Sequence, residues 1–208
     1  MTTGKPVYTD YLRHAVKDYF RPRVMERLLD PKLSETASWQ QLREMIDKLP
    51  ASDRGNLAED WHRGRHAPNA DPRVNVGVPR DTGPNAGKIE SRVIDAVDGN
   101  TAVEVKDISG RIDEDQLGAY LDMMAGKLRT GATGKQPPEI TKIKYVFTKT
   151  EGAIANLKLF AEHLTIQDNV GRLTVEVFDW QGNRHTVTTP TQALQLHGRL
   201  TAPRSQSL

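Results

Sequence analysis

The feature that most constrains this chain is a turn-forming triplet between two runs of strand-forming residues. Asp98-Gly99-Asn100 separates residues 91–97 from residues 101–106, and both runs contain several β-branched side chains. A short Asp-Gly or Gly-Asn turn flanked by such runs is a strong signal for a β-hairpin. We therefore expect residues 91–106 to form two antiparallel strands joined by a tight turn.

The length of this turn decides which side chains share a face of the hairpin. A two-residue loop made of residues 98–99 or of residues 99–100 puts Asp95 on the face that carries Glu104 and Lys106. In the second register Asp95 lies directly opposite Glu104. Only a three-residue loop would move Asp95 to the other face.

Asp95, Glu104 and Lys106 are the residue types of a metal centre that hydrolyses phosphodiesters. Two neighbouring carboxylates repel each other, so both gain from a shared cation. Hard oxygen ligands that leave coordination sites to water and phosphate suit Mg²⁺, with Mn²⁺ as an alternative. The metal would polarise the phosphoryl oxygen and help to generate hydroxide, while the lysine would neutralise developing charge or orient the water. The structural alternative is a charged, solvated sheet face, on which a Glu-x-Lys triplet is common.

The rest of the chain alternates between helical and strand patterns. Residues 8–29 predict two helical pieces with a break at Arg21-Pro22, and Ser38 with Gln41 predicts a capping box for a helix that Pro50 closes. A further helix is expected from Ser52 or Asp53. The later elements are expected as a helix opened by Asp113 with Gln116, a strand at 140–148, a helix at 151–164, a strand at 173–179 and a hairpin through 181–183.

The segment from His62 to Arg92 is rich in glycine and proline and carries more basic than acidic residues. This composition favours an extended loop over a packed element. A basic loop leading into an acidic centre could hold a phosphate backbone beside it. The candidate nucleic-acid contacts are Arg63, Arg65, Arg73, Arg80, Lys88 and Arg92.

The hairpin region resembles a known family, the PD-(D/E)XK or restriction-endonuclease-like nucleases. The matching residues are Asp95 and Glu104-Val105-Lys106, on a hairpin that a helix and further strands are expected to follow. The resemblance is strongest to the compact nuclease domains of bacterial antibacterial toxins, in which an Asp-Gly-containing hairpin runs into Glu-Val-Lys. No proline precedes Asp95, unlike the pattern that names the family.

Two further site residues follow from the resemblance. Many members carry a glutamate on the helix before the hairpin and a glutamine on the helix after it, and Glu59 and Gln116 occupy those places. Asp95, Glu104 and Glu59 would then be metal ligands. Gln116 would contact the metal-bound water, although its position also fits a capping box with Asp113.

The element order and the resemblance together imply an α/β fold with a mixed sheet. The expected core is restriction-endonuclease-like, in the order α-β-β-α-β-α-β, with an N-terminal helical extension. Residues 1–50 would form the extension, residues 51–200 the nuclease domain and residues 201–208 a flexible tail.

Composition limits the function classes. The chain has no cysteine, which excludes disulfides, thiolate metal sites and cysteine nucleophiles. With 29 basic and 27 acidic residues, the net charge of +2 does not by itself indicate a nucleic-acid partner. No apolar run approaches the length of a membrane span or of a classical signal peptide, so we expect a soluble chain without a membrane anchor.

The resemblance implies a Mg²⁺-dependent DNase of little sequence specificity, with RNA as an alternative substrate. It further implies a secreted or delivered effector that acts in the cytoplasm of a target bacterium and is neutralised by an immunity protein. One alternative is a housekeeping restriction or repair nuclease. The other is a non-catalytic module that binds nucleic acid or a partner and uses the three charges only for solubility.

Overall fold

The computed structural model describes Glu26, residues 29–30, 32–33, 35–80, 83–127 and 137–202 of the 208-residue chain. The helical pieces expected within residues 8–29 fall almost wholly outside these ranges. The chain divides into two compact units. Unit 1 is Met1–Pro68 with Gln181–Asn183, and unit 2 is Asn69–Trp180 with Arg184–Leu208.

The described part of unit 1 contains two helices, α3 (Glu35–Ile46) and α4 (Ala51–His66). Trp39 of α3 packs against Trp61 of α4, with ring centroids 5.8 Å apart. Unit 1 contains α4 together with α3, and its first segment ends at Pro68. The capping-box prediction at Ser38 is wrong, because Ser38 lies inside α3 and is fully buried.

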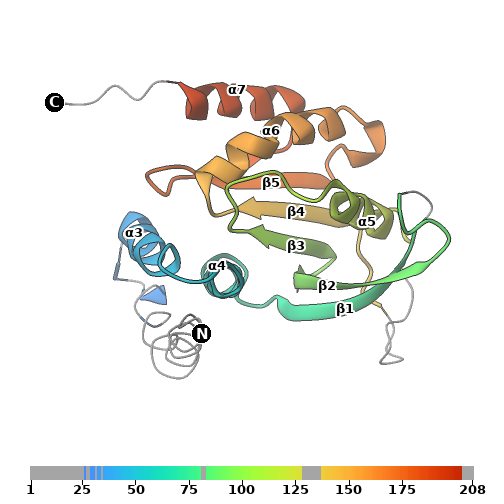
Figure 1. Ribbon diagram of the computed structural model, residues 1–208, viewed down its shortest axis with the longest axis horizontal. Helices are drawn as coiled ribbons and strands as arrows, with labels where there is room; N and C mark the ends of the chain where they lie inside the picture. Colours follow the sequence, from blue (N-terminus) through green and yellow to red (C-terminus); the bar gives the residue numbers. More distant parts are fainter. Residues whose placement is uncertain are drawn as a thin grey trace, which may run out of the picture. The chain divides into compact units, whose positions relative to one another are not determined.

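Unit 2 is built on a six-stranded mixed sheet whose strands lie in chain order (Figure 1). The strands are β1 (Asp71–Pro79), β2 (Ile89–Asp98), β3 (Thr101–Lys106), β4 (Lys142–Phe147), β5 (Leu173–Phe178) and β6 (Arg184–Val187). The pairs β1–β2, β2–β3 and β5–β6 are antiparallel, whereas β3–β4 and β4–β5 are parallel. The expectation of a mixed α/β fold is confirmed.

The predicted hairpin is present, and its register is the one with a loop of residues 99–100. Asp98 pairs with Thr101, which leaves Gly99 and Asn100 as the two loop residues. Gly99 has a φ of 59°, a conformation that glycine adopts at little cost and that tight hairpin turns require. The register therefore places Asp95 on the same face as Glu104.

The expected loop between His62 and Arg92 is wrong, because this segment contains the end of α4, all of β1 and the start of β2. Valines at 74, 76 and 78 give β1 the two-residue period of a half-buried strand. Pro72 and Pro79 lie at the two ends of β1, which is an edge strand and so tolerates them. The strand was not predicted because the segment's glycines and prolines are typical of a loop.

The described residues of unit 2 form three α-helices, α5 (Glu114–Met124), α6 (Thr150–Leu164) and α7 (Pro190–Thr201), and a short 3-10 helix, η2 (Gln167–Asn169). Side chains of α5 and α6 share one core with the sheet, in which Tyr145 of β4 contacts both Tyr120 and Phe160. α7 lies along α6 (Figure 1). No helix within the described ranges is long and apolar enough to cross a bilayer.

The α7 helix was missed in the sequence, although its start carries a clear signal. Thr189 and Gln192 form a reciprocal capping box, and Pro190 occupies the first turn. The expected flexible tail begins at the end of α7, and residues 203–208 lie outside the described ranges.

The connection from β3 to α5 is clamped by α6. Asn156 is fully buried; its Oδ1 accepts from Ile112 N–H at 2.9 Å, and its Nδ2 donates to the Gly110 carbonyl at 2.9 Å. The same loop passes so close to α6 that a Cβ on Gly152 would lie 2.2 Å from the Ile108 carbonyl oxygen. The loop that leads into α5 is thus fixed at both of these contacts.

Substituting Gly152 by alanine should lower the free energy of unfolding by about 1–3 kcal/mol, since the new methyl group would displace backbone. Gly198→Ala on α7 is the matched control, because a Cβ at that position would have no heavy atom within 4 Å. The control should be neutral or stabilising by up to about 1 kcal/mol. Urea denaturation of both variants measures the difference, and equal stability of the two would contradict the clamp.

Candidate active site

The candidate site lies where β3 meets α5 in unit 2. Glu104 is on the face of β3 that α5 covers, and its neighbour in register on β4 is Tyr145. Only 2% of Glu104 is exposed to solvent. A carboxylate this deeply buried needs hydrogen-bond donors or a cation, because desolvation strongly disfavours its charge.

Three donors meet the Glu104 carboxylate. The Tyr120 hydroxyl donates to Oε2, while Gln116 Nε2 donates to Oε1 at 2.8 Å. Lys106 Nζ also donates to Oε1, and it donates to Gln116 Oε1 at 2.9 Å. Glu104, Lys106 and Gln116 therefore form a closed triangle of hydrogen bonds.

Asp95 joins the site through an irregular part of β2. The regular β2–β3 ladder ends at the pair Ala96–Val103, and beyond it Val105 N–H donates to Asp95 Oδ2 at 2.8 Å. The Asp95 carboxylate therefore takes the place of a backbone acceptor at the end of the ladder. The aspartate is held beside the strand that carries Glu104.

The face alternation of β2 changes at the same place. Ile94 and Val97 both enter the core, although strict alternation would put them on opposite faces. On β1 the position facing Asp95 is Arg73, which is absent from the ladder and has a φ of 49°. This gap in the ladder coincides with the hydrogen bond from Val105 N–H to the Asp95 carboxylate.

The two carboxylates make this pocket of the core electronegative. Burial, followed by the charges of Glu104 and Asp95, raises the pKa of Tyr120 well above its usual value. The same causes, in the same order, raise the pKa of Tyr145. Both tyrosines therefore stay protonated at neutral pH.

The carboxylates of Asp95 and Glu104 are oxygen ligands of the kind that hard divalent cations prefer. Among the described residues no group of three or more His, Cys, Asp or Glu is arranged to hold a metal ion. Mg²⁺ is commonly bound through one or two carboxylates, with water and phosphate as the other ligands. Glu104 accepts three hydrogen bonds, and a carboxylate has about four acceptor positions, so it retains capacity for one further partner.

The contacts of Gln116 decide between its two interpretations, a residue of the site or a capping partner of Asp113. Asp113 caps α5 by accepting from Asp115 N–H at 2.9 Å. The side-chain hydrogen bonds of Gln116 go instead to Glu104 and Lys106. Gln116 therefore belongs to the site and is not a capping partner of Asp113.

Glu59 is the one expected catalytic residue that lies in the other unit. It is part of α4 in unit 1, whereas Asp95, Glu104, Lys106 and Gln116 all lie in unit 2. Its role as a third metal ligand stays a prediction.

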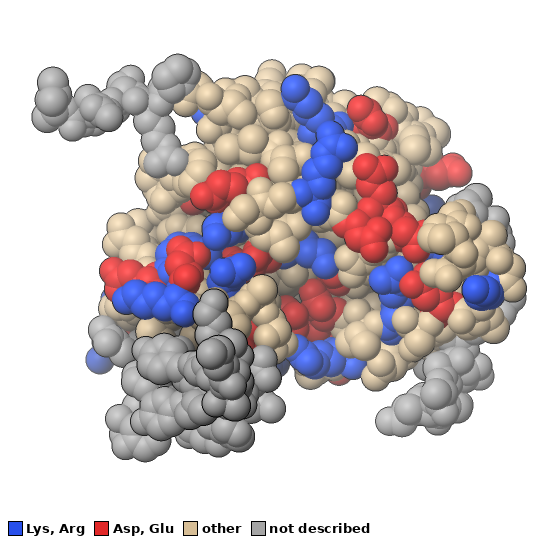
Figure 2. All heavy atoms as spheres, viewed as in Figure 1, with Lys and Arg blue, Asp and Glu red and all other residues tan. Residues whose placement is uncertain are grey.

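The expected basic loop does not exist as one segment. Arg63 and Arg65 are on α4, Arg73 is exposed on β1 and Lys88 is exposed between β1 and β2. Arg80 is wrong as a nucleic-acid contact, because only 2% of its side chain is exposed and it is paired within unit 2. Arg92 is also paired, with Glu90 and Asp115. In Figure 2, the basic and acidic side chains of the face in view are interspersed.

Tyr120 and Tyr145 are the site residues that sequence reasoning missed. Tyr120 lies on the helix that was expected after Asp113, but it was not expected to take part in the site. The available signal was its spacing from Gln116, because residues i and i+4 of a helix share a face. A second polar group on that face indicated that α5 covers something polar.

No known protein family, no curated protein and no solved structure matches this chain.

The two buried tyrosines should respond differently to loss of their hydroxyl groups. Tyr120→Phe removes a hydrogen bond to a buried carboxylate and should cost about 1.5–3 kcal/mol of stability. The Tyr145 hydroxyl is buried without a hydrogen-bond partner among the described residues, so Tyr145→Phe should stabilise by about 1 kcal/mol. Urea denaturation at pH 7 tests the pair, and an equal loss in both would show that the Tyr145 hydroxyl is bonded.

Stability should also fall in alkaline solution. The folded-state pKa of each tyrosine lies above its ordinary value of 10.0, so the unfolded chain loses these protons first as pH rises. The free energy of unfolding should then decrease above pH 10, by up to about 1.4 kcal/mol per pH unit for each tyrosine. Tyr145→Phe should remove its share of this slope, and an unchanged slope would contradict the assignment.

Proposed function

We propose that this chain is a metal-dependent nuclease that hydrolyses phosphodiester bonds of DNA with little sequence specificity. The observation that carries the proposal is the hydrogen-bonded triangle of Glu104, Lys106 and Gln116 beside Asp95. These four residue types, on a hairpin and the following helix, are the set expected from the resemblance to PD-(D/E)XK nucleases. The order of β1, β2, β3, α5 and β4, with β4 parallel to β3, is compatible with that core.

The burial of Glu104 favours this proposal over the solvated-charge alternative. Charges that only solubilise a sheet face lie in water, whereas Glu104 is 2% exposed and is covered by α5. A buried carboxylate lowers stability unless it is paired, and apolar residues of similar size would be tolerated at least as well. The arrangement is therefore easier to explain by chemistry at this position than by solubility.

The proposed roles follow from the contacts. Asp95 and Glu104 would hold Mg²⁺, which when bound polarises a phosphoryl oxygen and lowers the pKa of a water molecule. Tyr120 and Gln116 keep the Glu104 carboxylate in one orientation. Lys106, held by Glu104 and Gln116, would place its ammonium group where negative charge develops on the phosphate.

The distribution of charge bears on the substrate class. The overall charge of +2 and the interspersed charges in Figure 2 favour backbone contacts of modest strength over an extended basic groove. The absence of a base-reading pattern among Arg73, Lys88 and the other basic residues predicts cleavage with little sequence preference. The antibacterial effector role and the immunity protein rest on the resemblance alone.

Cleavage of supercoiled plasmid tests the proposal. The purified protein should nick or linearise plasmid in Mg²⁺ or Mn²⁺, and EDTA should abolish the reaction. Glu104→Ala and Lys106→Ala should each lower the rate at least about 100-fold, because each removes a group that acts on the reacting phosphate. A parallel assay with single-stranded RNA separates the two nucleic acids.

Matched controls come from exposed residues of α6. Glu162→Ala and Lys158→Ala change the same charges as the two active-site variants and should retain wild-type rates. Circular dichroism confirms that each variant is folded. Metal-independent cleavage, or full activity in both active-site variants, would refute the proposed mechanism.

A further inference from the structure

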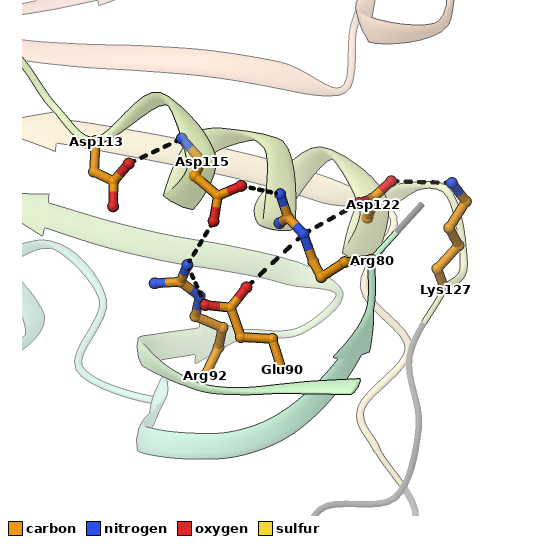
Figure 3. A network of polar contacts seen from close by, with 7 residues as sticks. All are labelled: Arg80, Glu90, Arg92, Asp113, Asp115, Asp122 and Lys127. Carbon is orange, nitrogen blue, oxygen red and sulfur yellow. Dashed lines mark hydrogen bonds and ion pairs between the residues drawn. The ribbon is translucent and has the colours of Figure 1, made fainter. Parts of the chain in front are cut away.

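A second buried charge lies near the candidate site, on the other side of α5. Arg80 directly follows β1, and only 2% of its side chain is exposed. Arg80 Nη2 donates to Asp115 Oδ1 at 2.7 Å, and its Nε lies 3.8 Å from Glu90 Oε2 and 3.9 Å from Asp122 Oδ2 (Figure 3). One guanidinium group thus connects the end of β1 with β2 and with two positions of α5.

Further ion pairs extend this cluster. Arg92 Nη2 lies 2.5 Å from Glu90 Oε1 and 3.6 Å from Asp115 Oδ2. Lys127 Nζ lies 3.0 Å from Asp122 Oδ1. Figure 3 shows the acids of α5 pointing toward the two arginines. The three acids are balanced by three cations, so the cluster requires no external ion.

The α5 helix presents two stripes on different sides of the helix. Asp115, Gly118 and Asp122 have the spacing i, i+3, i+7 and form the stripe that meets Arg80. Gly118 permits this approach, because a Cβ there would lie 3.2 Å from Arg80 Nη2. Gln116 and Tyr120 form the second stripe, which holds Glu104 and lies about 150° around the helix from the first. A rotation of α5 that broke the first contact would also displace the second.

Stability alone does not account for Arg80. Its Nε and Nη1 are buried and have no hydrogen-bond partner among the described residues. A buried charge with incomplete hydrogen bonding carries a large desolvation penalty, and well-packed apolar residues often match or exceed such pairs in stability. What a guanidinium group adds is direction, because its planar fork bonds carboxylates in a fixed geometry.

We propose that Arg80 is a positioning residue for the candidate active site. By binding the Asp115 stripe of α5, Arg80 sets the rotation of that helix and so aims Gln116 and Tyr120 at the Glu104 carboxylate. The activity part of this inference rests on the proposed nuclease function. The positional part does not.

The test compares Arg80→Lys and Asp115→Asn with Glu114→Ala, a control on the same helix. Glu114 is 64% exposed, and its ion pair with Arg111 is long, at 4.0 Å. Arg80→Lys keeps the charge but loses the fork, whereas Asp115→Asn is the milder change at a more exposed partner. Plasmid cleavage is measured far below each melting temperature, so that every variant is fully folded.

We expect both test variants to lower kcat about 10-fold or more, with KM for DNA unchanged because Arg80 is shielded from substrate. The side-chain amide resonance of Gln116, identified by its loss in Gln116→Ala, should shift in both variants and not in Glu114→Ala. Wild-type kcat and unshifted Gln116 resonances in the folded variants would overturn the proposal. A change confined to KM and to salt dependence would do so as well, because it would make Arg80 a substrate contact.

The cleavage assay and the Gln116 resonance test the proposed function and the positional role of Arg80 separately. If the wild-type protein and Glu114→Ala both fail to cleave nucleic acid, the proposed function fails. The Gln116 resonance still tests the positional role of Arg80 in that case.

Discussion

The buried carboxylate of Glu104 is the constraint on which the site depends. Its charge is stable at 2% exposure only because a tyrosine, a glutamine and a lysine donate to it. Two of these donors come from α5, so the helix cannot slide or rotate on the sheet without leaving a buried charge unpaired. Apolar packing brings α5 to the sheet, and this carboxylate fixes how the helix is set there.

Polar contacts hold the supporting elements from other directions. Asn156 of α6 holds the loop that enters α5, and Arg80 holds α5 through Asp115, on another side of the helix from Gln116 and Tyr120. On β2, the side chain of Asp95 replaces a ladder acceptor next to β3. Each element that contributes to the candidate site is thus fixed by a directional bond in addition to the core, which is the precision that catalysis requires.

The parts that local sequence signals determine were predictable. The hairpin and the shared face of Asp95 and Glu104 follow from a two-residue turn and strand alternation, and both are present. The β1 strand was not predicted, because prolines are disfavoured inside a sheet. Its prolines are tolerated because β1 lies at the edge of the sheet, which the local sequence does not reveal. The burial of Arg80 could not be predicted either. No local sequence signal distinguishes an arginine in a basic loop from an arginine that is surrounded by three acids distant in the sequence.

We propose that Asp95 and Glu104, the acidic pair on this hairpin, hold a catalytic cation. Diffraction from crystals soaked in Mn²⁺, recorded at a wavelength with strong manganese anomalous scattering, tests this proposal. The account predicts an anomalous peak within about 2–2.5 Å of carboxylate oxygens of both Asp95 and Glu104, and loss of that peak in Glu104→Ala. A well-ordered site without a peak, or manganese bound only elsewhere on the protein, would contradict it.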